Sequence, residues 1–502
     1  MTQTRSLVVK GGRLLDIDKD KAEPADILVS AGFVLDIGPP GSFDAVAADR
    51  LDAADRLLVP GLVNAHTHAH GALGRGAVGD QVPLELFLNA SGAINGQRTR
   101  DDKYLTAALS AAEMIRRGCT ASFDLFVEFP APSAEGMRAT AQAYWDAGMR
   151  AVVAPMMADR TLYQALPGLL EAIPAALRGP FEKLALAPFE TSLANLKPIY
   201  ADWPFDRAFV KPGIAPTIPL HCSDAFLSAC GVYARDYGLQ LQTHLAETKV
   251  QAVLARQKYG TGMTQHLDSL GLLGPHFSGA HGIWIDRSEM DLVAKRGGRI
   301  AHNPSSNLRL GSGVASIREM LDAGIELAIG TDGTNTGDGQ NIFEAARLAA
   351  YLSRLQGPDY RQWVTAREAF VAATQGSAAL LGFDKIGKIA PGYAADIVFL
   401  ALDQPQYVPL RSPLTQMVFA ESGSAIRRVM IGGKVVFEDG KLLTLDEAKL
   451  RREAEAAAAR LDAANEGAKH AAASIHDFVG TFCMAHGRAD CAIRRRLDCQ
   501  AV

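Results

Sequence analysis

Cysteine is scarce in this sequence, with six residues in a chain of 502. That number is too small for a disulfide scaffold, so we expect reduced thiols and a cytosolic protein. The opening residues, "MTQTRSLVVKGG", lack the apolar core of a signal peptide. No apolar run reaches the length of a transmembrane helix, and we therefore expect no membrane partner.

An excess of charge of either sign is also missing, because the net charge is only −4 and 21% of the residues are charged. This balance gives no general attraction to nucleic acid or to an anionic surface, so neither is an expected partner. Hydrophobic residues make up 48% of the chain, which is enough to bury a large core and argues against disorder. The length predicts two or three structural units.

Short strand patterns with turns occur at both ends of the chain. The early ones are "SLVVKGGRLLDI" and "ADILVSAGFVLDIG", and the late ones are "AADIVFLALD" and "IRRVMIGGKVVFEDGKLL". Strand-rich pieces on either side of a long middle predict one small composite domain. We assign it to residues 1–56 and 392–443 and expect a β-sandwich.

The middle of the chain, residues 57–391, alternates apolar strand candidates with amphipathic helical stretches. Eight such repeats predict an α/β fold, a parallel (β/α)8 barrel of the TIM type, whose chemistry lies at the carboxyl ends of the strands. The predicted strands are residues 57–66, 118–126, 150–157, 210–219, 239–247, 277–285, 299–307 and 326–335.

The last segment, residues 444–502, is rich in alanine and predicts a helical extension packed on the barrel or on a second subunit. Thr444 and Glu447 have the spacing of a capping box at its start. Near its end lie Cys483, Cys491 and Cys499, whose spacing matches no recognised zinc arrangement. We interpret them as ordinary thiols.

The first barrel strand runs into "GLVNAHTHAHGALGRG", residues 61–76, which holds three alternating histidines. Residues two apart in a strand point the same way, so His66 and His68 can bind one metal ion together. His70 lies past the strand and is interpreted as a loop residue. A bare His-x-His pair is more often structural, and only further ligands would favour a metal site.

Such residues recur at the ends of the later strands. The fifth strand ends with His244 and, three residues on, Glu247; the sixth ends with His281, and the eighth with Asp332. The seventh carries His302. Imidazole and carboxylate ligands of this kind suit zinc or iron with one position open for water.

The order His-x-His, His-x-x-Glu, His, Asp is similar to that of the amidohydrolase superfamily, in its mononuclear aminohydrolase branch. "AHNPSSNLRLGSG" followed by "LAIGTDG" carries the same resemblance. That branch includes S-adenosylhomocysteine deaminases, cytosine deaminases and triazine hydrolases. The resemblance implies a hydrolase acting on carbon–nitrogen bonds other than peptide bonds.

The resemblance also implies residue roles. His66, His68, His244 and Asp332 would bind one divalent transition metal, Zn²⁺ or Fe²⁺, which makes hydroxide available from water near neutral pH. Asp332 would also accept a proton from that water. Glu247 would protonate the ring nitrogen and then the leaving group, and His281 would polarise the attacking oxygen or the substrate.

Relatives with two metals bind them through a lysine at the end of the fourth strand. The lysine available here, Lys211, stands at the opposite end of that strand, which predicts a single metal. Further candidates for substrate contact are Trp284, which could stack on a ring, and His302, Asn303 and Asn335.

Two groups that recognise nucleosides in this branch are missing. Thr217 stands where a histidine is expected near the fourth strand, and residues 95–97, Asn-Gly-Gln, contain no acid to bind a ribose. Sugar hydroxyls would lack partners, so we expect a smaller planar N-heterocycle (a purine, pyrimidine, pterin or triazine) rather than S-adenosylhomocysteine or methylthioadenosine.

Two alternatives remain beside the deaminase. The same site could hydrolyse a C–Cl, N-alkyl or amide bond, as in triazine hydrolases, or the barrel could be an inactive binding protein. We expect a homodimer or a higher homo-oligomer in each case.

Overall fold

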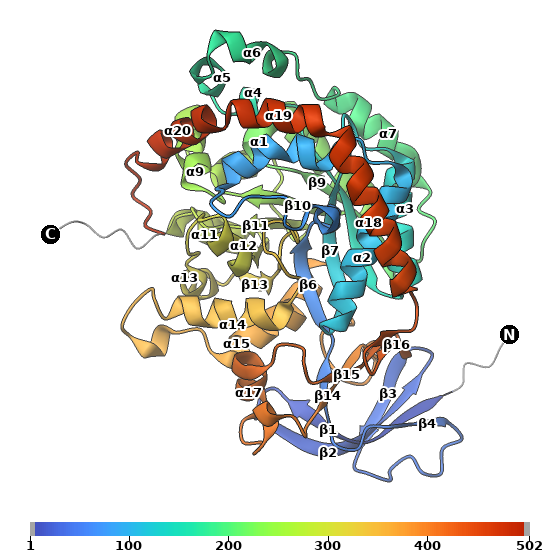
Figure 1. Ribbon diagram of the computed structural model, residues 1–502. Coiled ribbons are helices and arrows are strands. Elements are labelled where there is room, and N and C mark those ends of the chain that lie inside the picture. Colours follow the sequence, from blue (N-terminus) through green and yellow to red (C-terminus); the bar gives the residue numbers. More distant parts are fainter. Residues whose placement is uncertain (1–5, 496–502) are drawn as a thin grey trace.

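The computed structural model describes residues 6–495, which form two sheets and the helices around them (Figure 1). One sheet is parallel and eight-stranded, in the order β13-β12-β11-β10-β9-β8-β7-β6, with most of the helices outside it. This is the predicted barrel. Its strands are β6 (Leu62–Thr67), β7 (Cys119–Val127), β8 (Arg150–Met157), β9 (Val210–Pro216), β10 (Gln240–Leu245), β11 (Phe277–His281), β12 (Arg299–His302) and β13 (Glu326–Ile329).

The first and last strands of this sheet meet at their carboxyl ends. The backbone N–H groups of Thr331 and Asp332 both donate to the carbonyl oxygen of His66, at 3.2 and 3.0 Å. These bonds join the end of β6 to the segment that follows β13. The closure therefore places Asp332 beside the histidines of β6.

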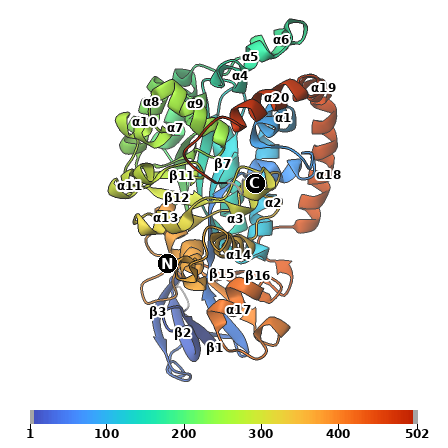
Figure 2. The same cartoon turned by 90° about the vertical axis from the view of Figure 1, so that its left-hand side faces the viewer.

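The sheet of the small composite domain (the small sheet) has nine strands among the described residues and is built from both ends of the chain, as predicted. It lies below the barrel in Figures 1 and 2. Its path is β17-β16-β15-β14-β5-β1-β2-β3, with β4 paired to β1. The strands are β1 (Leu7–Asp16), β2 (Lys21–Ser30), β3 (Phe33–Gly38), β4 (Asp49–Asp52), β5 (Arg56–Pro60), β14 (Ile397–Ala401), β15 (Ile426–Ile431), β16 (Lys434–Glu438) and β17 (Lys441–Leu442).

The single strand predicted over residues 57–66 is wrong, because that apolar run forms β5 in the small sheet and β6 in the barrel. The change occurs at Gly61, whose N–H donates to Asp396 O of the small sheet at 2.9 Å, while Leu62 N–H donates to Gly118 O of the barrel at 3.0 Å. A Cβ at Gly61 would lie 2.1 Å from the Thr120 hydroxyl. Only glycine lets the chain pass this close to β7.

Helices follow most barrel strands and cover its outer face. Helix α2 begins at Arg100, directly after Thr99, because Thr99 and Asp102 form a capping box there. The helices of this layer are α1 (Leu84–Asn95), α2 (Arg100–Arg116), α3 (Ala134–Ala147), α7 (Phe189–Ala201), α8 (Asp224–Tyr237), α9 (Lys249–Tyr259), α10 (Met263–Ser269), α11 (Arg287–Lys295), α13 (Ile317–Asp322) and α14 (Ile342–Ser353).

The C-terminal extension contains α18 (Glu447–Ala464), α19 (Glu466–Ser474) and α20 (His476–Gly487), which cross the barrel over α2, α1 and α9 (Figure 1). The capping box predicted from Thr444 and Glu447 is wrong. Asp446 caps α18 by accepting the N–H of Lys449 at 2.9 Å, and the Thr444 hydroxyl instead donates to Ala147 O at 2.8 Å.

Hydrogen bonds tie the extension to the loops at the carboxyl face of the barrel. Asn465 donates to Gly96 O at 3.1 Å, and Asn89 of α1 donates to Ala472 O at 3.0 Å. Farther on, Arg495 donates to the carbonyl oxygens of Ile283 and Ile285 at 2.8 and 3.0 Å. The extension therefore packs on the barrel of its own chain.

Cys483 and Cys491 are free thiols, and Cys499 lies outside the described residues. Neither of the two described thiols belongs to a cluster of potential metal ligands within residues 6–495. In the same part of the chain, no helix is long and apolar enough to cross a membrane.

A buried ion pair joins the barrel to the small sheet, and its loss should destabilise the protein. Arg150 Nε lies 2.9 Å from Asp396 Oδ2, and the Asp396 carboxylate also accepts the N–H of Gly432 at 2.7 Å. In Asp396→Ala the guanidinium stays buried without its partner, so we expect a loss of about 3–5 kcal/mol in urea unfolding. Asp359→Asn, which breaks the exposed pair with Arg361, is the control and should leave the midpoint unchanged. An unchanged midpoint in Asp396→Ala would contradict this role of the pair.

Candidate metal centre and active site

Strand ends on opposite sides of the barrel bring four histidines and one aspartate together. The ring centroids of His66 and His68 are 4.7 Å apart, and those of His66 and His244 are 5.0 Å apart. Possible ligand atoms of His66, His68 and Asp332 all lie within 4.8 Å of one another, and so do those of His66, His244 and His281. The sequence pattern thus corresponds to one compact cluster.

An oxygen atom fixes the orientation of each of the three rings nearest the centre. His66 Nδ1 lies 2.6 Å from Gln242 Oε1, His68 Nδ1 lies 2.8 Å from Leu125 O, and His244 Nδ1 lies 2.6 Å from Thr217 O. An oxygen acceptor requires the proton on Nδ1, which leaves the Nε2 lone pair facing inward.

The hydrogen bonds of the Gln242 side chain determine which of its amide atoms faces His66. Its Nε2 donates to Ala65 O and to Ser278 Oγ, both at 3.1 Å, so Oε1 is the atom that faces His66. The tautomer of His66 therefore follows from the hydrogen bonds of Gln242.

These lone pairs converge where a cation would stabilise them. His68 Nε2 and His244 Nε2 are 3.1 Å apart, although both nitrogens are acceptors in this tautomer. His66 Nε2 is buried and has no hydrogen-bond partner among the described residues. Facing lone pairs repel each other unless a metal ion or a proton lies between them, so the residues present fit a metal.

Burial keeps the imidazoles of His66 and His244 neutral, as metal ligands must be. Burial, followed by the charge of His68, lowers the pKa of His244 to about 3. Burial and His68 also hold the pKa of His66 well below its ordinary value. Neither ring carries a proton on Nε2 at neutral pH that would compete with a cation.

Asp332 faces the same centre as a carboxylate. Its Oδ1 lies 3.3 Å from His68 Nε2 and 3.7 Å from His66 Nε2, and its Oδ2 accepts the Ser306 hydroxyl at 2.6 Å. Burial alone would raise the pKa of Asp332, but His68, His66 and the other groups around it outweigh burial and lower the pKa below its usual range. The carboxylate therefore stays ionised and can bind a metal.

Two residues of the cluster have a strained backbone. Asp332 has φ of 64° and His281 has φ of 71°, in the left-handed region that favours glycine. Each such position costs on the order of 1–3 kcal/mol, and the surrounding hydrogen bonds must hold it. The strained residues are those whose side chains turn toward the histidine cluster.

Glu247 stands beside this centre and is almost wholly buried. Its Oε2 lies 3.6 Å from His281 Nε2, while Oε1 has no hydrogen-bond partner among the described residues. Burial, then the charges of Asp332 and Glu85, raise the pKa of Glu247 well above its ordinary value. The side chain therefore holds a proton more readily than an exposed glutamate does and can give it away.

An amide side chain orients His281, as Gln242 orients His66. Asn307 Oδ1 lies 2.8 Å from His281 Nδ1, so the unpartnered Nε2 is an acceptor that faces Glu247 and Asp332. Burial lowers the pKa of His281, with Asp332 acting in the opposite direction. The neutral ring can accept a hydrogen bond from a water in the site.

The four candidate substrate contacts lie around the cluster rather than within it. Both ring nitrogens of His302 are buried without a hydrogen-bond partner in the described chain, and the same holds for Asn303 Oδ1 and Asn335 Nδ2. Burial lowers the pKa of His302 to about 3. Trp284 is buried and donates its indole N–H to Ser312 O at 2.8 Å.

Several supporting residues were missed by the sequence reasoning. Gln242 precedes His244 by two residues on β10, and this spacing could have indicated that both side chains point inward. Asn307 and Ser306 belong to the same "AHNPSSN" segment as His302. Glu85 of α1 is buried, and its Oε1 accepts the hydroxyl of Thr248 at 2.7 Å, but nothing in its local sequence marks it.

His70 and Lys211 lie outside the cluster of possible ligands. His70 is buried in the short helix after β6, with its ring centroid 5.3 Å from that of His68. Lys211 is the second residue of β9, donates to Gly382 O and lies over the Phe383 ring. No lysine stands at the carboxyl end of β9, where a second metal would need one.

Comparison with known proteins gives the family. The amidohydrolase family model matches residues 57–436. A 5-methylthioadenosine/S-adenosylhomocysteine deaminase of Haloarcula marismortui is 32% identical over 461 residues, 91% of this chain and 98% of the relative. A 5'-deoxyadenosine deaminase of Methanothermobacter thermautotrophicus is 31% identical over 466 residues, 91% of this chain and 99% of the relative.

Solved structures agree with these relatives. An adenosine deaminase from Xanthomonas campestris with bound zinc has a TM-score of 0.79 at 26% identity, covering 91% of this chain and 98% of its own. An atrazine chlorohydrolase from Arthrobacter aurescens, complexed with zinc and atraton, has a TM-score of 0.79 at 25% identity, covering 90% and 100%.

These matches confirm the predicted enzyme class, a hydrolase that acts on carbon–nitrogen bonds other than peptide bonds. Together with the cluster at the strand ends, they show that the chain belongs to the amidohydrolase family.

Proposed function

We propose that this protein is a metal-dependent hydrolytic deaminase that releases ammonia from a planar N-heterocycle. One observation carries the proposal. Three imidazoles and an ionised carboxylate converge on one point, and a buried carboxylic acid with a raised pKa lies beside them. A hydrolase that must protonate an amine needs both parts at once.

In this proposal His66, His68, His244 and Asp332 bind one divalent transition metal. Three nitrogen ligands and one oxygen ligand suit zinc, and iron(II) is the alternative. The zinc in the Xanthomonas structure supports the same choice. When bound, the metal lowers the pKa of a coordinated water so that hydroxide is available near neutral pH.

The protein's own residues then move protons. Asp332 is ionised and accepts the proton of the attacking water. Glu247 holds a proton in the resting enzyme and gives it to a ring nitrogen of the substrate. The two protons of the attacking water then pass through Asp332 and Glu247: one protonates the departing amine, which leaves as ammonia, and the other restores the acid form of Glu247. The Nε2 atom of His281 accepts a hydrogen bond from the attacking oxygen and so orients it.

The substrate class follows from the surroundings of the site. The carbonyl of Thr217 orients His244, in a position where nucleoside deaminases of this branch carry a histidine. The unpartnered polar atoms of His302, Asn303 and Asn335 supply hydrogen bonds for ring nitrogens and exocyclic groups, and Trp284 provides an apolar wall. We propose a purine, pyrimidine, pterin or triazine that carries an amino group.

A second candidate is hydrolysis of a C–Cl or N-alkyl bond on a triazine. The likeness to the atrazine chlorohydrolase favours it, at a TM-score of 0.79. Ammonia, chloride and alkylamine release from a panel of purines, pyrimidines, pterins and triazines separates the two candidates.

A homodimer or a higher oligomer in the cytosol is part of the proposal. Large apolar side chains are exposed on one segment after β13, namely Tyr351, Leu355 and Tyr360 at 42%, 59% and 71%. Such a group favours contact with a second copy of the chain.

Metal content is the first test. We expect about one transition-metal ion per chain by elemental analysis, because the carboxyl end of β9 offers no bridging lysine. Two tightly bound ions that are both retained after Cys483 and Cys491 are replaced by serine would contradict the single-metal site.

Metal affinity should also depend on Gln242, which orients His66. In Gln242→Leu the His66 ring loses its acceptor, and we expect metal affinity to fall by about 10–100-fold in a chelator competition. Gln416→Leu, in the small-sheet region, is the control, because the Gln416 side-chain amide donates to Gln406 O and does not contact the cluster. Equal affinities in the two variants would show that Gln242 has no such role.

Glu247→Gln tests the proton transfer. Glutamine keeps the shape and hydrogen bonding of the side chain but cannot exchange a proton. We expect wild-type metal content, substrate affinity within about tenfold and turnover reduced by roughly 10²-fold or more.

Glu326→Gln, which alters an acid paired with Arg299 at the start of β13, is the control and should retain full turnover. Ammonia release by Glu247→Gln at the wild-type rate would refute the mechanism. If chloride is the natural leaving group, Glu247→Gln should keep a much larger share of its activity, because chloride departs without a proton.

A further inference from the structure

A cavity of about 230 Å³ lies next to the proposed acid, between the barrel and the last helix of the extension. Its inner wall includes Glu85, Thr248 and Lys249, and its outer wall includes Cys483 and Arg488. Thr248 directly follows Glu247, and Glu85 lies near enough to Glu247 for its charge to raise the pKa of that acid. Two lining residues of the cavity therefore lie beside Glu247.

The acidic residue of this cavity is buried, and its two basic residues lie nearer the surface. Glu85 is only 4% exposed and its carboxylate is already bonded by the Thr248 hydroxyl at 2.7 Å. Lys249 is half-buried and Arg488 is exposed, so the two cations stand nearer the solvent than the acid. Within residues 6–495, neither Lys249 nor Arg488 has an ion-pair partner. The mouth of the cavity is therefore positive.

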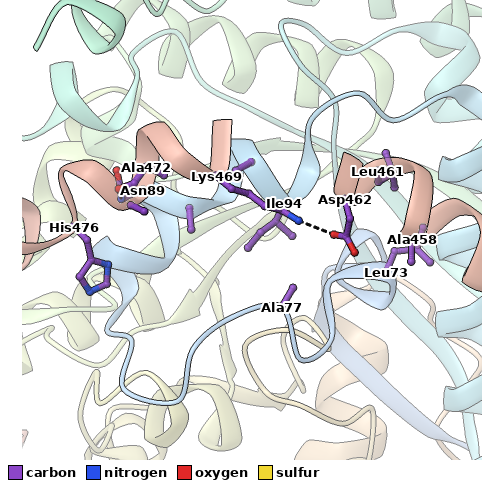
Figure 3. Close-up of a pocket in the computed structure, with 13 residues that line it drawn as sticks. Leu73, Ala77, Asn89, Ile94, Ala458, Leu461, Asp462, Lys469, Ala472 and His476 are labelled. Carbon is purple, nitrogen blue, oxygen red and sulfur yellow. Dashed lines mark hydrogen bonds and ion pairs between the residues drawn. The ribbon is translucent and has the colours of Figure 1, made fainter. Parts of the chain in front are cut away.

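A second cavity, of about 490 Å³, differs from the first in the charges of its lining residues (Figure 3). It lies between α1 and the extension and is walled largely by alanines, with Leu73, Ile94 and Leu461. Its lysine, Lys469, is paired with Asp462 at 2.6 Å, as the dashed line in Figure 3 marks. The positive charge of Lys469 is therefore balanced within that cavity, whereas Lys249 and Arg488 of the smaller cavity have no such partner among residues 6–495.

We propose that the smaller cavity is a subsite for an anionic substituent, a carboxylate or a phosphate, on the heterocyclic substrate. Lys249 and Arg488 bind the anion, and the helix start of α9, capped by Thr248, adds the favourable end of its dipole. The inference rests on the proposed function, because it assigns a part of that substrate. Arg488 lies beyond residue 436, where the family match ends, so the subsite belongs to this chain's extension.

Two matched pairs of compounds test the subsite. Pterin-6-carboxylate and pterin differ by one carboxylate, and their own fluorescence reports binding to the metal-loaded protein without any turnover. Adenosine monophosphate and adenosine differ by one phosphate, and their binding is measured by displacement of bound pterin-6-carboxylate. The pair with the larger preference identifies which anion the cavity takes.

We expect the wild-type protein to bind at least one charged compound about tenfold more tightly than its neutral partner, as hydrogen bonds to a charged group provide. The preference should weaken as salt is added. Arg488→Gln and Lys249→Gln should each reduce it severalfold, and Arg488→Lys should restore most of it. Arg452→Gln, an exposed arginine on α18 away from the cavity, should leave it unchanged.

Two results would overturn the subsite. One is a wild-type protein that prefers neither charged compound, and the other is a full preference that persists in the Lys249→Gln, Arg488→Gln double variant. Failure of the proposed function is a different result. If the protein keeps the charge preference but releases no ammonia from any heterocycle, the subsite stands and the deaminase proposal fails. If it releases ammonia but shows no charge preference, only the subsite fails.

Discussion

The site depends on one repeated interaction, a histidine Nδ1–H donated to a fixed oxygen. The acceptors are Leu125 O, Thr217 O, Gln242 Oε1 and Asn307 Oδ1, which come from different strands and loops of the barrel. Each bond selects the tautomer that presents Nε2 to the centre. The expected metal affinity and the orientation of His281 both follow from it.

This requirement explains why the barrel must close as it does. Asp332 reaches the histidines only because the backbone after β13 is bonded to His66 O. The left-handed backbone of Asp332 and His281 then turns their side chains inward at a local cost. Closure, strain and ligand position are parts of one arrangement, and a change at Thr331 or Gly330 would disturb all three.

Much of this arrangement was predictable from the sequence, because period-two alternation and strand-end position determine where His66, His68, His244, His281 and Asp332 must point. The oxygen acceptors were not, because two of them are backbone carbonyls, which any residue supplies. The break at Gly61 was hidden by an unbroken apolar run. The cap of α18 was misassigned because Thr444 and Asp446 both suit an N-cap, and only the neighbouring Ala147 O decides between them.

The composite small sheet has a consequence for how the chain is made. β5 pairs on one side with β1 and on the other with β14, and their partner residues include Leu57 and Leu400. The chain leaves the ribosome with its amino end first. The whole barrel must therefore be synthesised before β5 can pair with β14. Until then the N-terminal strands present an open, apolar edge, which is the kind of edge that pairs with other chains. The barrel must close quickly enough to bring β14 to that edge, so the folding rate of the catalytic domain limits how long the nascent protein is exposed to aggregation.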